Sequence, residues 1–219
     1  MSRERFFDDP GVITEEAFNL IAEAGYENFS IRKVASRLGV SPMTLYNYFP
    51  NLEALLKATV VYAFNHVLMT MQAELGCYFD HSGKCPLRVF PAIGYQLLDL
   101  MQRQPNVYKF LFMTDLKPFY NDKTILNRYE FAFRKTAEHL LDPSKEQELH
   151  QHVYLFEVLI NALVRSIFMR RAPVNEENFR LYVELAYDRL LKPFEPCFGG
   201  ECKHEDRSAS CAPQDNPSQ

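Results

Sequence analysis

Side chains that can bond nucleic acid gather in the stretch 41–48. Its hydroxyls and amides suit phosphate oxygens, amides also read base edges, and a threonine methyl can touch the methyl group of thymine. No Asp or Glu occurs over residues 28–52, whereas Arg32, Lys33 and Arg37 do occur there. This part of the chain is therefore locally positive, although the formal net charge of the whole chain is −4.

Two short helices and a tight turn would position these side chains. Ser30 can cap the first helix, whose apolar residues then fall on one face at helical spacing. Gly39 ends it, because the residue just past a helix often needs a positive φ. Ser41 and Pro42 supply a cap and a first position for the second helix, which we predict over residues 42–49. The pattern predicts a helix-turn-helix whose second helix reads DNA.

The same stretch resembles a known family. The motifs are Gly25-Tyr26, Ser30-Ile31-Arg32-Lys33-Val34-Ala35, Leu38-Gly39-Val40-Ser41, Thr44-Leu45-Tyr46-Asn47-Tyr48-Phe49 and residues 51–56. In spacing, in glycines and in the Leu-Tyr-x-x-Phe signature they resemble the DNA-binding domain of tetracycline-repressor-type (TetR-family) regulators. The resemblance covers the first quarter to third of the chain. The remainder is similar only in being helical and of suitable length.

Two positions depart from the family pattern. Leu52 stands where the family usually has a lysine that grips a phosphate. Met43 stands in the recognition helix where glycine is frequent. We expect the first to weaken the electrostatic grip on DNA and the second to alter base preference.

The resemblance and the outward-facing side chains together give a predicted DNA site. We expect base contacts from Arg32, Met43, Thr44 and Asn47. We expect the other members of the site to touch phosphates and sugars or to begin the recognition helix: Ser30, Lys33, Ser41, Pro42, Tyr46 and Tyr48.

The fold class that follows is all-α, because no sustained alternation and no hairpin turn signal occurs in the chain. We predict helices over residues 12–24, 31–38, 42–49, 51–75, 87–103, 105–116, 122–141, 144–170 and 176–191. The domain prediction is a helix-turn-helix DNA-binding domain at 1–50, a connecting helix at 51–75, a helical ligand-binding and dimerisation domain at 76–192 and a disordered tail at 193–219. At a rise of about 1.5 Å per residue, the connecting helix is long enough to leave one domain and enter another.

The last two long helices carry apolar residues in steps of three and four, the pattern of packed helices. The resemblance implies a homodimer through a four-helix bundle, with the following interface residues: Val153, Phe156, Ile160, Leu163, Ile167, Phe179, Val183, Ala186 and Leu190. An intramolecular core explains the same periodicity equally well. A second apolar face (Leu155, Leu159, Tyr182, Leu185) favours helices buried on two sides.

Aromatic residues and methionines crowd the region 87–170. Core packing explains most of them. The resemblance implies a pocket for an apolar or aromatic small molecule, for which we select Tyr95, Phe112, Met113, Tyr129 and Phe133.

Composition limits the remaining possibilities. Five cysteines (77, 85, 197, 202 and 211) form an odd set, which argues against a disulfide scaffold. The histidines at 139, 150 and 152 and the Cys/His residues of the tail fit no metal-ligand spacing, so we predict no metal and no cofactor. We see no membrane-span-length apolar run and no signal peptide, and expect a cytoplasmic protein. Phosphate loop, nucleophile elbow and paired-carboxylate motifs are absent from the sequence, and we predict no enzyme.

The sequence therefore predicts a DNA-binding transcriptional regulator, a homodimer on a palindromic operator, and most simply a repressor released by a small molecule. The alternative is a helical ligand-binding protein whose DNA binding is weakened or partner-dependent, or which acts as an activator. Leu52 and the acidic residues of the first ten positions motivate that alternative.

Overall fold

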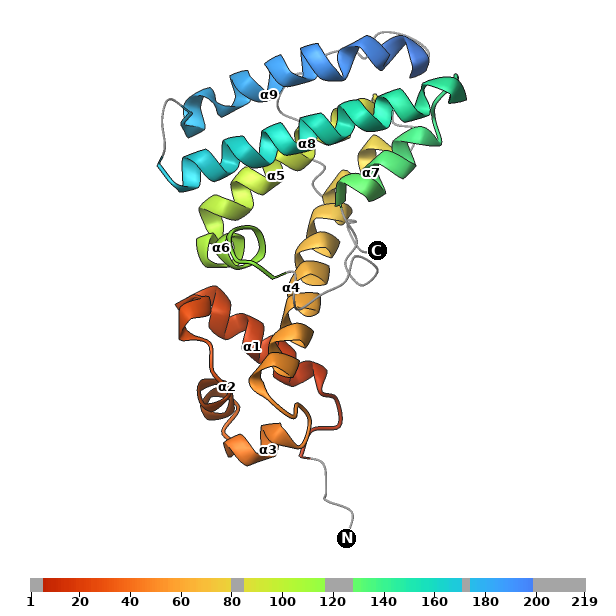
Figure 1. Cartoon of the computed structure of the whole chain (residues 1–219). Helices are drawn as coiled ribbons and strands as arrows, with labels where there is room; N and C mark the ends of the chain where they lie inside the picture. The colour runs from red at the N-terminus through yellow and green to blue at the C-terminus, as the bar shows by residue number, and fades with distance from the viewer. Residues whose placement is uncertain (1–5, 80–84, 117–127, 171–173, 199–219) are drawn as a thin grey trace, which may run out of the picture. The chain divides into compact units, whose positions relative to one another are not determined.

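A computed structural model describes residues 6–79, 85–116, 128–170 and 174–198 (Figure 1). All regular structure within these ranges is helical, which confirms the predicted fold class. The α-helices are α1 (Gly11–Ala24), α2 (Ile31–Arg37), α3 (Pro42–Tyr46), α4 (Leu52–Leu75), α5 (Val89–Arg103), α6 (Pro105–Met113), α7 (Arg128–Ala137), α8 (Glu146–Phe168) and α9 (Glu176–Leu190). Short 3₁₀ helices are η1 (Tyr26–Asn28), η2 (Gly76–Tyr78), η3 (Pro86–Arg88), η5 (Pro143–Lys145) and η6 (Lys192–Phe198).

The chain divides into two compact units, each built from two separate segments. One unit, here called the head, takes Met1–Leu68 and Leu100–Leu126. The other, here called the body, takes Met69–Asp99 and Asn127–Gln219. Two helices, α4 and α5, have residues in both units.

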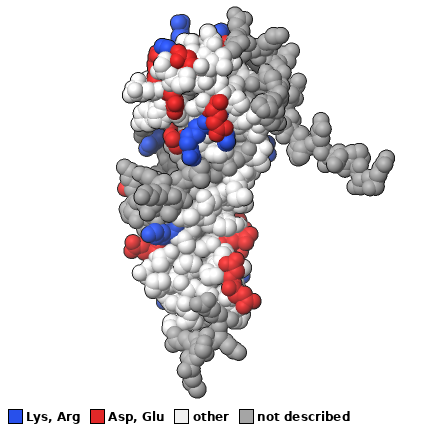
Figure 2. Space-filling view, turned by 90° about the vertical axis from the view of Figure 1, so that its right-hand side faces the viewer, with Lys and Arg blue, Asp and Glu red and all other residues white. Residues whose placement is uncertain are grey.

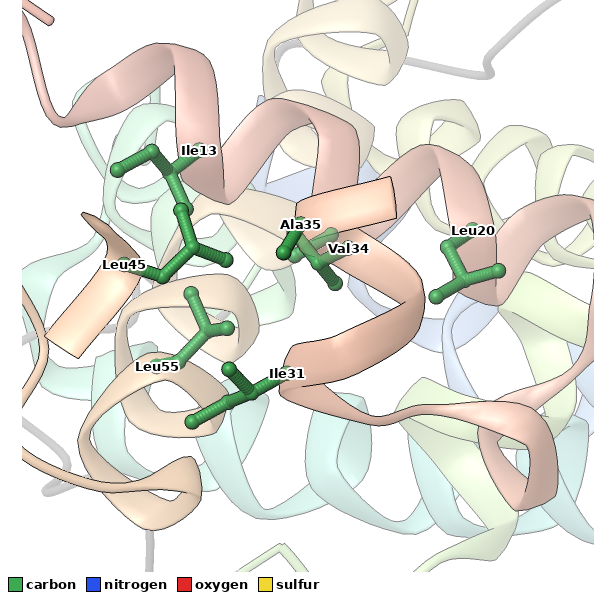
Figure 3. Packing of buried hydrophobic residues seen from close by; sticks show 8 residues of the cluster. Ile13, Leu20, Ile31, Val34, Ala35, Leu45 and Leu55 are labelled. Atoms are coloured by element: carbon green, nitrogen blue, oxygen red, sulfur yellow. The ribbon is translucent and has the colours of Figure 1, made fainter. Parts of the chain in front are cut away.

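The core of the head is made by α1, α2, α3 and the start of α4. Figure 3 shows side chains from these four helices pointing toward one another: Ile13, Leu20, Ile31, Val34, Ala35, Leu45 and Leu55. All of them are buried. Full burial of one such aliphatic side chain contributes about 1.5–3 kcal/mol, so this small cluster can fix the angle between α2 and α3.

Two serine caps and one glycine define the helix-turn-helix, as the sequence predicted. The backbone N–H of Lys33 donates to Ser30 Oγ at 3.3 Å, and that of Thr44 donates to Ser41 Oγ at 3.2 Å. Gly39 adopts φ 68°, a left-handed conformation that favours glycine. The recognition helix ends at Tyr46, earlier than predicted, with Asn47 as its C-terminal cap.

Helix α6 packs on α1 inside the head, whereas the sequence placed this helix in the ligand-binding region. Asn106 Nδ2 donates to the backbone carbonyl oxygens of Ala22, at 3.0 Å, and Glu23, at 3.2 Å. The last carbonyls of a helix lack intrahelical partners, so this amide completes the C-terminal end of α1.

Two further contacts join α6 to the segment after α1. The Lys109 ammonium pairs with the Glu27 carboxylate. The rings of Tyr26 and Phe110 lie 5.4 Å apart, and Phe110 is fully buried. The helix is thus fixed by a polar cap, an ion pair and an aromatic contact.

Helix α4 is apolar around much of its circumference. By length and composition alone, Leu52–Met71 would suffice to cross a membrane, whereas we expected no apolar run of that length from the sequence. However, 41% of this window is buried within the protein. A helix in a protein core can have the same length and apolar composition as a membrane-spanning helix. In addition, α4 has exposed charged or polar residues such as Lys57 and Asn65.

The body is organised around α8 and α9, which run side by side in Figure 1 and pack on one another. Their facing side chains include Phe156, Phe179 and Val183, all fully buried. Gly94 of α5 lets that helix approach α8, since a Cβ atom there would lie 3.0 Å from Ile160 Cγ2. Asn175 and Asn178 form a reciprocal cap at the start of α9.

Residues after α9 also belong to the packed part of the body. The sequence predicted a disordered tail from residue 193, but η6 begins only one residue after α9, and Phe194 and Glu195 are buried. Tyr187 Oη donates to Glu195 Oε1 at 2.8 Å, and the N–H of Leu141 donates to the carbonyl of Cys197 at 2.9 Å. Only the part of the predicted tail beyond residue 198 lies outside the described residues.

Cys77 and Cys85 are each disulfide-bonded, whereas the odd cysteine count had argued against a disulfide scaffold. Cys77 lies in η2, directly after α4, and Cys85 caps η3, directly before α5. Cys197 is a free thiol. The positions 202 and 211 lie outside the described residues.

Candidate nucleic-acid interface

The outer face of α3 carries most of the predicted DNA site. Met43 and Tyr46 are 66% and 45% exposed, and Asn47 is also exposed. Thr44 and Pro42 are half-buried at the start of the helix. Leu45 faces inward with no exposed surface, whereas Met43 and Tyr46 are presented to solvent.

The capping geometry arranges the hydroxyls of α3. Ser41 Oγ accepts from the N–H of Thr44, and the two hydroxyls lie 3.1 Å apart. A capping serine and a paired threonine at a helix N-terminus form a polar surface that can donate hydrogen bonds to a phosphate. Ser41 is exposed, so its hydroxyl stays accessible while it caps.

Helix α2 supplies two exposed cations, Arg32 and Lys33. Lys33 Nζ donates to Asn28 Oδ1 at 3.0 Å, which holds the ammonium beside the start of the helix, near the capping Ser30. Arg32 is exposed on the same turn. These two side chains carry the positive charge that the helix-turn-helix can offer to DNA.

Arg37, the third cation of the stretch, is committed to α1. Its guanidinium pairs with Glu16 and forms two bonds with Glu23, at 2.6 and 3.0 Å. The hydrogen bonds that Arg37 donates to Glu23 and to Glu16 raise the pKa of Arg37, and the bond from Arg37 lowers the pKa of Glu23. The sequence counted Arg37 toward the local positive charge, but two carboxylates offset it.

Tyr48 holds the start of the chain rather than pointing away from the head. Its hydroxyl accepts from the N–H of Phe7 at 2.6 Å and donates to the carbonyl of Phe7 at 3.0 Å. The two rings lie 5.8 Å apart. Tyr48 therefore fixes where the first described residues run, beside the end of the recognition helix; its predicted phosphate contact stays a prediction.

Charge is mixed on the surface seen in Figure 2. Lys and Arg side chains lie next to Asp and Glu, with uncharged areas between them, and this face carries no broad basic field. Non-specific DNA binding depends on such a field. Because the formal net charge of the whole chain is also −4, we expect DNA binding to depend on a few well-placed contacts.

The predicted dimer residues fall mainly inside the body. Of the nine, the structure buries Val153, Phe156, Ile160, Leu163, Phe179, Val183 and Ala186 in the chain's own core, and leaves Ile167 and Leu190 half-buried. The second face of the same helices is exposed instead, with apolar residues at Tyr154, Leu155, Val158, Leu159, Leu181 and Leu185. We call these six residues the α8/α9 face.

The predicted ligand-binding residues belong to different units. Phe112 and Met113 lie in the head, where the Phe112 ring is 5.4 Å from that of Tyr108. Tyr129 and Phe133 are buried in the body. As the lining of one pocket, these residues stay a prediction.

The fifth of these residues, Tyr95, lies in a polar network of the body. Its hydroxyl donates to Glu184 Oε1 at 2.9 Å, and Arg88 donates to the other oxygen of Glu184 at 2.8 Å. Burial and the neighbouring Glu184 raise the pKa of Tyr95. The Arg88 guanidinium also lies over the ring of Tyr187, 3.8 Å from its centre. No sequence pattern indicates this network, because its members are far apart in the chain.

Two of the histidines set aside in the sequence have partners in the body. His150 lies 3.4 Å from Glu130 Oε2, and His152 Nδ1 lies 2.8 Å from the carbonyl oxygen of Leu190. Within the described ranges, no group of three His, Cys, Asp or Glu residues could hold a metal ion.

The fold and this interface define a helix-turn-helix DNA-binding protein. A profile of bacterial regulatory proteins of the TetR family matches residues 13–59, the range of α1 to the start of α4. Residues 13–59 are therefore similar to the DNA-binding domain of TetR-family regulators, which are DNA-binding proteins rather than enzymes. No curated protein sequence matches the chain significantly.

Solved structures share the fold at low sequence identity. A TetR transcriptional regulator from a Rhodococcus species is 18% identical, with a TM-score of 0.53 over 82% of this chain and 93% of its own. The multidrug binding protein EbrR, complexed with imidazole, is 16% identical, with a TM-score of 0.54 over 81% and 96%. A TetR variant from Acinetobacter baumannii AYE in complex with minocycline is 18% identical, with a TM-score of 0.53 over 88% and 99%.

Proposed function

We propose that this protein is a homodimeric repressor that leaves a palindromic operator when a small apolar or aromatic molecule binds. The exposed face of α3, capped by Ser41 and flanked by Arg32 and Lys33, carries the proposal. Its side chains combine amide, hydroxyl and guanidinium groups, which read base edges and bond phosphates. The residues proposed to contact DNA are those named from the sequence. We expect the protein to act in the cytoplasm, where its operator lies.

The α8/α9 face supports the dimer. Its six apolar side chains cover one side of a helix pair, and contiguous exposed apolar surface of this kind marks an interface. A second copy seated on this face would form a four-helix bundle. A two-fold dimer presents two recognition helices to a palindrome, as two half-sites require.

Two observations support the release of DNA by a ligand: the course of helix α4, and ligand complexes of proteins with the same fold. Helix α4 starts in the head at Leu52 and ends in the body at Leu75, so a change in the body can reach the head through one helix. Relatives of this fold are in complex with minocycline and with imidazole. The ligand must bind the state that does not fit DNA more tightly than the state that does.

A weaker or partner-dependent DNA binder is the second candidate. Leu52, where the family usually has a lysine, is 42% exposed, and Arg37 is paired with two carboxylates. Both observations reduce the positive charge available to DNA. An activator would use the same interface.

A titration of DNA from around the protein's own gene, in a salt series and against a scrambled duplex, tests the proposal. We expect a saturable complex with an even number of protomers that outlasts moderate salt and that scrambled DNA does not displace. Arg32→Ala should weaken this complex, and Arg37→Ala serves as the matched control. Equal affinity for both duplexes would favour the second candidate.

The class of ligand can then be identified from the compounds that dissociate the complex of the protein with operator DNA. Minocycline and other aromatic compounds would be added to the operator complex. We expect at least one of them to release the DNA at concentrations that leave the protein folded. If compounds bind the protein but the complex persists, release by ligand is wrong.

A further inference from the structure

Tyr48 fixes the backbone of Phe7 in place. Its hydroxyl accepts a hydrogen bond from the N–H of Phe7 at 2.6 Å and donates one to the carbonyl oxygen of the same residue at 3.0 Å. The two rings lie 5.8 Å apart, and both side chains are partly buried against the core of the head. The first residues of a domain are poorly ordered unless other residues tie them down, and this pair of hydrogen bonds does so at residue 7.

The residue before this fixed point is an exposed phenylalanine. Phe6 is 67% exposed, and its ring lies edge-on to that of Phe7, with the two ring centres 5.0 Å apart. A single exposed apolar side chain is ordinary on a protein surface. Phe6 differs because its neighbour in the chain is held by two hydrogen bonds and its ring by an aromatic contact. Such a side chain loses little further freedom when it binds a partner.

Phe6 is joined to the proposed DNA interface through Tyr48. Tyr48 comes directly after Asn47, the C-terminal cap of α3, and Tyr46 and Asn47 are exposed. A recognition helix lies in the major groove with its N-terminal residues toward the bases, so the chain at its other end lies nearer the sugar–phosphate backbone. A phenyl ring cannot bond a phosphate, but it can pack on the apolar faces of deoxyribose sugars.

We propose that Phe6 is a DNA-binding residue that packs on deoxyribose sugars beside the bases read by α3, and that Tyr48 is the positioning residue that holds it there. This inference rests on the proposed function and adds a residue outside the helix-turn-helix to the DNA interface. It also gives the Tyr48 hydroxyl a role other than a phosphate contact. That hydroxyl has one proton, which it donates to Phe7, and a phosphate oxygen only accepts. The ring of Tyr48 can still pack on the DNA backbone.

Phe6→Ala in the full-length protein tests the contact, on operator DNA and on a scrambled duplex across a salt series. We expect operator affinity to fall by about tenfold or more, since the variant no longer buries an aromatic ring on binding. Contacts to sugars carry no sequence information, so the preference for operator over scrambled DNA should stay the same. The slope of the logarithm of the binding constant against that of the salt concentration should also stay the same, because no phosphate is neutralised by Phe6.

Two further variants serve as controls. Phe6→Leu keeps an apolar side chain and should recover most of the affinity, whereas Leu141→Ala removes a leucine that is 70% exposed in the body and should leave binding unchanged. Unchanged operator affinity in Phe6→Ala overturns the proposed contact. A shallower salt slope in that variant would show that a displaced cation accounts for the loss, and it would overturn the contact as well.

Tyr48→Phe removes the hydroxyl and keeps the ring. We expect faster hydrogen exchange at the amide of Phe7, measured by NMR, unchanged exchange in α9, and a loss of operator affinity no larger than that of Phe6→Ala. In a double variant with Phe6→Ala, the change at Tyr48 should cause no further loss, because it acts through Phe6. If Tyr48→Phe weakens binding equally with and without Phe6, its hydroxyl contacts DNA by itself, and the positioning role is wrong.

Failure of the proposed function can be told apart from failure of this inference. If the unmodified protein does not prefer operator over scrambled DNA, the proposed function is wrong, but the effect of Phe6→Ala on binding to either duplex still tests the sugar contact. If the unmodified protein prefers operator and Phe6→Ala binds it equally well, only this inference fails.

Discussion

The two arginines of α2 have different roles in the head. Arg32 is exposed at the start of the helix, whereas Arg37 at its end pairs with Glu16 and Glu23 of α1. The same residue type is thus available to DNA at one position and used to join two helices at the other. The sequence alone could not distinguish them, because the partners of Arg37 are 14 and 21 residues away.

Arg32→Ala should therefore weaken operator binding, while Arg37→Ala should mainly lower thermal stability. Loss of one good base contact costs about 1–3 kcal/mol, which corresponds to roughly a 5- to 150-fold loss of affinity. Fluorescence anisotropy on operator DNA and thermal unfolding of both variants check this. Comparable losses of affinity in the two variants would show that Arg37 leaves its carboxylates and contacts DNA.

Single ion pairs also affect how the thermal stability of the protein changes at acidic pH. A hydrogen bond from Arg37 lowers the pKa of Glu23, and one from Lys109 lowers that of Glu27, below the ordinary value of 4.5. Each pair therefore adds stability above the ordinary pKa and loses it as the pH falls through the lowered pKa. We expect the melting temperature to drop below about pH 4.5, and to drop less steeply in a Lys109→Met variant. If the melting temperature of the Lys109→Met variant falls with pH as steeply as that of the unmodified protein, the ion pair does not contribute to the stability.

At the scale of elements, α6 is the part of the head that sequence reasoning missed. Its boundaries were nearly right, but its partner was not, since the contact with α1 is formed by residues about 80 positions apart. The helix-turn-helix itself was predictable because its caps, its glycine and its apolar spacing are all local. The same distinction applies to α8 and α9: periodicity identified the apolar stripes correctly, but only packing shows that one stripe is used within the chain.

Asn106→Ala should loosen the last turn of α1. The variant leaves the carbonyls of Ala22 and Glu23 without the amide, and loss of such bonds costs about 1–2 kcal/mol. Hydrogen exchange should become faster at the C-terminal end of α1 and stay unchanged in α9. Unchanged protection in α1 would mean that other contacts suffice to hold α6.

For the whole molecule, the exposed α8/α9 face decides the oligomeric state. Leu159→Glu with Leu185→Glu puts two charges on this face and should give monomers, because a buried charge without a partner is costly. Sedimentation measures the mass, and we expect operator affinity to fall by at least about 100-fold, since the two heads would no longer bind together. Leu141→Glu, at an exposed leucine outside α8 and α9, is the control and should stay dimeric.

A double variant that remains dimeric would show that the copies associate through another surface. A monomeric double variant that keeps full operator affinity would contradict the requirement for two heads instead. The two results therefore test separate parts of the proposed function.

The position of α6 in the head also limits where the gene can recombine with genes of similar regulators. A crossover after residue 68 would transfer the whole helix-turn-helix but leave behind the helix that completes α1. The hybrid would need a foreign helix with an amide at the position of Asn106 and an aromatic ring at that of Phe110. Substitutions in α1 and α6 should therefore accumulate together, and exchange of DNA specificity between such regulators should proceed through the few surface residues of α3 rather than through transfer of the N-terminal block.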